Sequence, residues 1–179
     1  GLGDVYKRQL ILDLYRRMPS VRITDMLLEV DAALGFTDAF THLRTGAPCR
    51  DRIGLLNVLL AEGLNLGLRK MAEATNTHDY WQLSRLARWH VESEAMNQAL
   101  AIVVAAQGKL PMSRVWGMGT SASSDGQFFP TARHGEAMNM VNAKYGSVPG
   151  LKAYTHVSDQ FAPFACQSIP ATVSEAPYI

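Results

Sequence analysis

Residues 151–169, LKAYTHVSDQFAPFACQSI, contain two short runs of alternating side chains joined by the segment SDQFAP. In the first run the odd-numbered residues 151–157 fall on one face and the even-numbered residues 152–158 on the other, which is typical of a half-buried strand. The face that carries Lys152, Tyr154 and His156 is expected to be solvated. With its short connection, the stretch predicts a β-hairpin.

Upstream of the hairpin, the segment GTSASSDGQFF (residues 119–129) is a weaker third strand, because most of its side chains are small. Residues 130–149 are rich in Gly, Pro, Asn and Lys and are expected to form a long loop. Residues 111–179 are therefore interpreted as a β-meander.

Residues 10–110 have a different pattern, with apolar side chains at helical spacing. Helices are expected from Thr24 as N-cap to a stop at Gly35, over 51–74 with interruptions at Gly63 and Gly67, over 80–90, and over 92–107. The core of the last, AMNQALAIVVAA, is apolar nearly all round and is expected to be central and buried. Helices followed by strands predict an α+β fold.

Composition excludes several classes of protein. Of the 179 residues 47% are hydrophobic, which is enough for a core of normal size. The 17 Lys and Arg nearly balance the 16 Asp and Glu, so net charge alone does not indicate a nucleic-acid or membrane partner. Cys49 and Cys166 lack metal-knuckle or disulfide spacing, which favours a cytoplasmic protein. No apolar run approaches the roughly 20 residues that cross a bilayer, so no membrane partner is expected.

Asp125, in SSDGQ, has two interpretations. Asp-Gly is a strong hairpin-turn signal, and from this motif alone the turn is favoured. The alternative is a carboxylate on a strand whose small neighbours leave room for a divalent cation, which prefers oxygen ligands. The other nearby acids, Glu136, Asp159 and Glu175, have no convincing spacing for such a site.

Nucleophilic catalysis is a further hypothesis, because three serines surround this position. It requires a histidine within about 3 Å of Ser121, Ser123 or Ser124. The five histidines show no zinc-type pairing and are interpreted as surface or hydrogen-bonded residues.

Contacts to DNA phosphates are the last candidate chemistry. Arg133 and Lys144 lie in the long loop and Lys152 on the predicted strand, and we treat these three as DNA-contact candidates. The arginine pairs 50 and 52, and 85 and 88, are more simply solvated charges, and the three tryptophans are expected in the core.

Seven segments, taken together, resemble one family. They are VRITDMLLEVD (21–31), FTHLRTGAPCRDR (40–52), GLNLGLRKMAEAT (63–75), SRLARWHVESE (84–94), SSDGQFF (123–129), NAKYGSVPG (142–150) and YTHVSDQFAPF (154–164). In that order they closely resemble the large transposases of the Tn3 family, which drive replicative transposition of bacterial DNA. One local departure is Met118, where many members have a polar or small residue.

The resemblance implies a DDE catalytic site on a ribonuclease H-like fold. It implies that Asp125 is the first acid, on the first strand, and that residues 111–179 are an incomplete catalytic domain with its first three strands. The second Asp and the Glu are expected beyond Ile179. Three carboxylates would hold two Mg²⁺ ions about 4 Å apart and serve strand cleavage and strand transfer.

Further expectations concern the chain as a whole. The partners implied are transposon-end and target DNA, with a dimer for the full-length protein, in the cytoplasm and on the nucleoid. Residues 1–9, which include DVYKRQ, are interpreted as a translated sequencing adapter, and this chain alone is expected to be inactive. The alternative is a non-catalytic helical module that binds DNA or protein.

Overall fold

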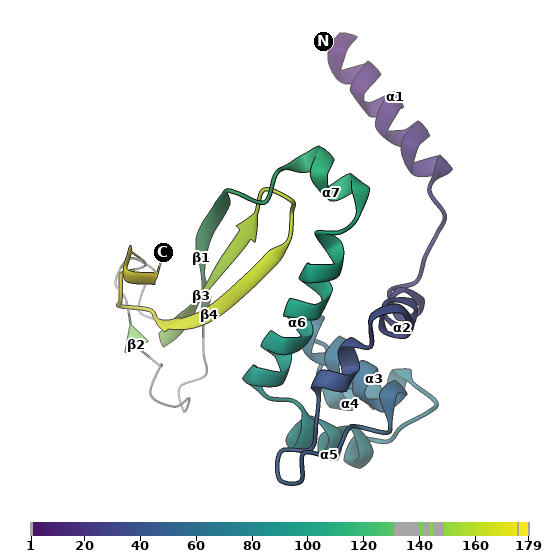
Figure 1. Cartoon of the computed structure of the whole chain (residues 1–179), viewed down its shortest axis with the longest axis vertical. Coiled ribbons are helices and arrows are strands. Elements are labelled where there is room, and N and C mark those ends of the chain that lie inside the picture. The colour runs from purple at the N-terminus through teal and green to yellow at the C-terminus, as the bar shows by residue number, and fades with distance from the viewer. Residues whose placement is uncertain (1, 131–139, 142–143, 145–148, 175, 179) are drawn as a thin grey trace.

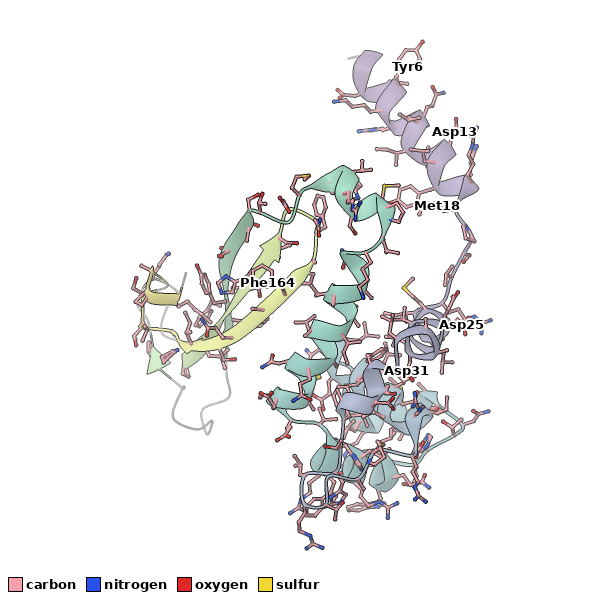
Figure 2. The ribbon with its side chains drawn as sticks, in the orientation of Figure 1. Tyr6, Asp13, Met18, Asp25, Asp31 and Phe164 are labelled. Atoms are coloured by element: carbon pink, nitrogen blue, oxygen red, sulfur yellow. The ribbon has the colours of Figure 1, made fainter. Side chains whose placement is uncertain are left out.

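The computed structural model describes residues 2–130, 140–141, 144, 149–174 and 176–178, as a helical part and a small sheet (Figure 1). The helices are α1 (Leu2–Arg17), α2 (Ile23–Leu34), η1 (Phe36–Ala39), α3 (Arg52–Gly63), α4 (Leu68–Ala74), α5 (Tyr80–His90), α6 (Ser93–Gln107), α7 (Pro111–Trp116) and η3 (Ala176–Tyr178). Helix α1, which carries Tyr6 and Asp13, extends away from the remaining helices (Figure 2). Among the described residues, no helix is both long and apolar enough to cross a bilayer.

Local signals set most of the helix ends. Gly35 ends α2 with φ +66°, a conformation that favours glycine. Asp51 caps α3 by accepting a hydrogen bond from Gly54 N at 2.9 Å. Asp79 and Gln82 form a reciprocal capping box at the start of α5. The predicted N-cap at Thr24 is wrong, because α2 begins at Ile23.

The core of the helical part consists of two clusters that share partly buried side chains. One cluster contains Phe36, Phe40, Cys49, Leu55, Leu56, Ala95 and Ala99, and the other contains Val58, Ala61, Met71 and Leu83. Leu86 packs against both clusters. The two faces of α3 therefore bury different neighbours, and α5 closes the second cluster.

A buried carboxylate ties α2, η1 and α3 together. Asp31 is only 4% exposed and accepts hydrogen bonds from Thr37 N and Thr37 Oγ1, each at 2.9 Å. Arg52 Nη1 lies 3.0 Å from Asp31 Oδ2, and its other nitrogen pairs with Asp38. Figure 2 shows Asp31 among the packed helices. Burial raises the pKa of Asp31, but the bonds from Thr37 and Arg52 outweigh it and leave this pKa below its usual value.

Replacing Asp31 with Asn is expected to lower the free energy of unfolding by about 2 kcal/mol at pH 7, because charge-assisted bonds are lost in a buried site. A pKa that is depressed on folding stabilises the protein above the unfolded pKa of about 3.9, and this contribution is lost as pH falls through the folded value. The difference between wild type and variant should therefore shrink below about pH 4. Urea unfolding at several pH values measures it.

Asp13→Asn is the control for that series, since Asp13 is exposed and its ion pair with Arg16 is long, at 3.9 Å, and therefore weak. A difference for Asp31→Asn that does not change with pH would contradict the expectation.

The sheet has β3 (Pro149–Ser158) at its centre. Strands β1 (Ala122–Pro130) and β4 (Pro163–Pro170) pair antiparallel with its two sides, and the short β2 (Met140–Val141) pairs with its first residues. Gly150 is required there, because a Cβ would come within 2.4 Å of the Phe128 ring. The predicted hairpin and the weaker third strand are confirmed.

The two faces of the sheet differ in burial, in the opposite sense to the prediction. Lys152, Tyr154 and Ile169 share a face and are 5%, 3% and 1% exposed, so the expectation that this face is solvated is wrong. Residues that follow β4 account for part of the cover, since Lys152 Nζ donates to Val173 O at 2.6 Å. Side chains alternate along each strand, so the face that carries Asp125 is the open one.

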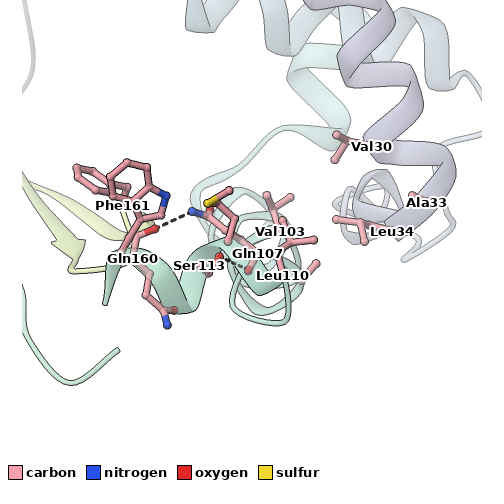
Figure 3. A pocket seen from close by; sticks show the side chains of 12 residues that line it. Val30, Ala33, Leu34, Val103, Gln107, Leu110, Ser113, Gln160 and Phe161 are labelled. Atoms are coloured by element: carbon pink, nitrogen blue, oxygen red, sulfur yellow. Dashed lines mark hydrogen bonds between the residues drawn. The ribbon is translucent and has the colours of Figure 1, made fainter. Parts of the chain in front are cut away.

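Helix α6 lies beside the sheet and joins it to the helical part (Figure 1). Gln107 Nε2 donates to Gln160 O at 3.0 Å across this junction (Figure 3). The expectation that α6 is buried is wrong, because only Ala95 and Ala99 are buried along it and Met96 is 47% exposed. Its apolar side chains instead line an open hollow of about 520 Å³ between α2, α7 and the β3–β4 turn.

Candidate active site

Asp125 lies in the middle of β1, where it pairs with Thr155 of β3. Four more residues of β1 follow Gly126, so the hairpin-turn interpretation of Asp-Gly is wrong. The Asp125 side chain is exposed on the open face, and its Oδ1 accepts a hydrogen bond from Gly126 N at 2.9 Å. A carboxylate in this position is fixed by the sheet and open to a ligand.

The side chains around Asp125 are small or polar. Thr155 and Cys166 continue the same cross-strand row, with Thr155 Oγ1 3.5 Å from Cys166 Sγ. On β1 the same face carries Ser123, Gln127 and Phe129, all exposed, and Ser123 and Gln127 are the two next to Asp125. The row therefore leaves the surface beside the carboxylate free of bulky side chains.

Other acids do not join Asp125 in the described part of the chain. No group of three or more His, Cys, Asp or Glu residues there is placed to hold a metal ion. Glu136 and Glu175 lie outside the described residues. Asp159 is at the β3–β4 turn, four residues beyond the partner of Asp125.

Asp159 has a structural role at that turn. Its Oδ1 accepts from Gly119 N at 2.8 Å and its Oδ2 from Ser121 Oγ at 3.1 Å, which holds the start of β1 against the turn. Desolvation raises the pKa of Asp159, but these bonds and those from the Thr120 and Ser121 backbone hold it below its usual value. All of these hydrogen bonds come from the segment 119–121, which connects α7 to β1.

Ser124 and His156 form a hydrogen-bonded pair on the opposite face from Asp125. Ser124 Oγ is 2.7 Å from His156 Nδ1, which satisfies the distance required by the serine-hydrolase hypothesis. The His156 ring packs against Tyr154 and Phe164, and among the described residues no carboxylate bonds to its other nitrogen. A dyad without an orienting acid or a set of oxyanion donors is better explained as a cross-strand bond.

The three DNA-contact candidates are not brought together. Arg133 lies outside the described residues, and Lys144 is exposed. Lys152 is buried with its ammonium on the Val173 carbonyl, so in this structure it does not present its charge to a phosphate. Lys152 was a candidate because its face of the strand was expected to be solvated, and the burial of Lys152 contradicts that expectation.

Sequence reasoning set aside a different feature, the outer side of α5, because it interpreted Arg85 and Arg88 as solvated charges and Trp81 as a core residue. Trp81 and Trp116 were expected in the core but are 77% and 59% exposed. Trp81, Arg85 and Arg88 share one helical face, and this spacing of four and three residues was a usable signal.

The family of the chain follows from a match over most of its length. Residues 25–179 match the family model described as the Tn3 transposase DDE domain. This chain belongs to that family, as the seven sequence segments predicted.

Relatives in several bacteria agree with the match. The chain is 44% identical over 162 residues to the transposase for transposon Tn3926 of Escherichia coli and 43% identical over 162 residues to that for Tn501 of Pseudomonas aeruginosa. Each alignment covers 90% of this chain and 16% of the relative. The transposase for Tn1546 of Enterococcus faecium is 36% identical over 171 residues, which is 93% of this chain and 17% of that protein. The chain thus spans a small part of the length of these relatives.

Proposed function

We propose that this chain is part of the catalytic domain of a DNA transposase and that Asp125 is one of the carboxylates of its active site. The domain cleaves DNA at transposon ends and joins the freed 3′ hydroxyl to target DNA in replicative transposition. The observation that carries the proposal is the exposed, mid-strand position of Asp125 in a chain of the Tn3 transposase family.

The sheet supports a ribonuclease H-like assignment. Strands β1, β3 and β4 are antiparallel neighbours in the order expected for the first three strands of that fold, and Asp125 is on the first of them. Residues 111–179 would then be the beginning of the catalytic domain and residues 10–110 a helical region before it. Two further acids of the full-length protein would complete the site.

The donor chemistry of Asp125 fits a divalent cation in part. A carboxylate with an open surface beside it is the type of ligand that Mg²⁺ prefers, with waters and substrate phosphates in its remaining positions. In the complete site, two Mg²⁺ ions would stabilise the charge on the attacking and leaving oxygens of the phosphodiester. Asp125 would bind the ions from a fixed position on the open face of the sheet. The small side chains of Thr155 and Cys166 beside it would leave space for the DNA backbone.

One carboxylate holds such ions weakly, so we propose that the 179-residue chain does not cut DNA. Incubation with duplex transposon-end DNA and Mg²⁺ should leave the DNA intact in a denaturing gel. Nicking that disappears in Asp125→Asn would overturn this part of the proposal.

The role of Asp125 as a ligand has a separate test with Mn²⁺ as the probe. Paramagnetic Mn²⁺ should broaden the backbone amide signals of residues 123–127 and of Thr155, and Asp125→Asn should remove this effect. Glu94→Gln, a matched change at an exposed acid on α6, should not. Broadening that is the same in Asp125→Asn would contradict the assignment.

The remaining expectations belong to the full-length protein. We propose that it binds transposon-end and target DNA, acts as a dimer in the bacterial cytoplasm and associates with the nucleoid through DNA. The rival interpretation, a helical module without catalysis, predicts that Asp125 has no part in strand cleavage.

A further inference from the structure

Helix α5 has a buried side and an outer side that is unusually rich in arginine and tryptophan. Leu83 is fully buried against α3 and α4, and Leu86 packs in the same core. On the outer side Trp81, Arg85 and Arg88 are all exposed. Trp81 is 77% exposed, so folding buries little of its apolar surface and leaves most of it accessible to a partner.

Aromatic and cationic side chains are in contact at the C-terminal end of α5. The Arg88 guanidinium lies 5.7 Å from the centre of the Trp89 ring, and Trp89 stacks on His42 at 5.1 Å with an interplanar angle of 10°. His90 meets His42 edge to face at 5.3 Å. Leu43 N donates to Trp89 O at 2.8 Å, which fixes the segment 41–48 against the helix.

A similar contact lies at the N-terminal end. The Arg69 guanidinium of α4 is 4.8 Å from the centre of the Tyr80 ring, and Tyr80 meets Trp81 edge to face at 5.3 Å. These contacts hold flat side chains and guanidinium groups in fixed positions along the helix. Less conformational entropy is then lost when a ligand binds.

The charge of this region is of one sign, although the chain as a whole is nearly balanced. Residues 80–90 and 41–48 contain three arginines (44, 85 and 88) and no Asp or Glu. All three arginines are exposed, and in the described residues neither Arg85 nor Arg88 appears in an ion pair. Arg52, by contrast, is used by Asp31 and Asp38. The charge on α5 is therefore available to an anionic partner.

We propose that the α5 surface, defined by Trp81, Arg85, Arg88 and Arg44, binds the phosphate backbone of duplex DNA. The proposal rests on the proposed function, which makes DNA the partner, and it adds a contact on the helical region, away from Asp125. Trp81 and Arg88 are seven residues apart, about 10 Å along a helix. Duplex DNA presents about three phosphates per strand over that length, and arginine matches phosphate oxygens in pairs.

Binding of the full 179-residue chain to a fluorescein-labelled random 20-base-pair duplex, measured by anisotropy from about 50 to 200 mM salt, tests the proposal. Arg85→Gln with Arg88→Gln should raise Kd about tenfold and reduce the slope of log K against log salt by about 2, because each lost phosphate contact removes about 0.9. The random sequence suffices, since phosphate contacts do not read bases.

Lys109→Gln with Arg114→Gln is the matched control, because both residues are exposed and lie on or near α7. This variant has the same charge change and should bind as the wild type does. Equal weakening in both double variants would show an effect of net charge only and would overturn the proposal, as would absence of binding by the wild type at 50 mM salt.

Two further measurements separate this inference from the assignment of Asp125. The double variant Arg85→Gln with Arg88→Gln should show the same Mn²⁺ broadening of residues 123–127 as the wild type, so the result at the α5 surface and the result at Asp125 are obtained separately. DNA should also quench tryptophan emission, and Trp81→Phe should remove most of the quenching. Quenching that persists fully in Trp81→Phe would place the duplex elsewhere.

Discussion

In a full-length transposase that contains these residues, Asp125→Asn is expected to reduce strand cleavage and strand transfer by about 10³-fold or more. The amide keeps the size of the side chain but removes the charge that the proposed site needs, and loss of one preorganised electrostatic group already costs 10²–10³-fold. Cleavage of labelled transposon-end DNA and joining to a target plasmid measure the two steps. Both should fall together, since one site serves both.

The same experiment needs a variant with an equal change of charge. Asp25→Asn provides it, because Asp25 is an exposed acid in the first turn of α2 and belongs to neither proposed site. Binding of transposon ends should be unchanged in both variants. Wild-type cleavage by Asp125→Asn would exclude the residue from catalysis and favour the non-catalytic module.

Leu83→Ala is expected to have the largest effect on stability, a loss of about 3 kcal/mol. Leu83 is 0% exposed and belongs to the cluster with Val58, Ala61 and Met71, so truncation leaves a cavity between α3, α4 and α5. For a chain of this size the loss corresponds to a fall of roughly 8 °C in Tm. Urea unfolding followed by far-ultraviolet circular dichroism gives the free energy directly.

Leu64→Ala is the control, because Leu64 is 56% exposed at the end of α3 and should cost less than about 0.5 kcal/mol. If the two variants were equally stable, the packing of α5 on α3 and α4 would differ from that described.

Elements with local signals were predictable from sequence. The helix over 80–90 has its capping residues in sequence at Asp79 and Gln82, and the helix that stops at Gly35 has a residue suited to its positive φ. The strands at 151–169 follow from a period of two. In each case the physical cause lies within a few residues of the element.

Burial was less predictable, because it depends on what packs against an element. Alternation placed Lys152 and Tyr154 on one face correctly, but it does not say which face of the sheet is covered. Residues after β4 contribute to this cover through the Lys152–Val173 contact, and they lie outside the strand pattern itself. The predictions that α6 and Trp81 are buried were wrong for the same reason, because apolar character was equated with burial.

The candidate site was only partly accessible to local reasoning. Asp-Gly on its own favours a turn. In this structure both residues pair with β3 instead, and this pairing depends on residues distant in sequence. Family resemblance placed Asp125 on a strand, and the strand position is confirmed. Its catalytic role stays a prediction until the variants are measured.

The arrangement of the sheet also bears on handling of the protein. Within the described residues, β1 and β4 each pair as strands only with β3, so no further described strand covers their outer edges. Concentrated samples of these 179 residues should therefore assemble edge to edge into β-rich oligomers. A lysine introduced on an outward position of β4, such as Ser168→Lys, should keep such samples monodisperse.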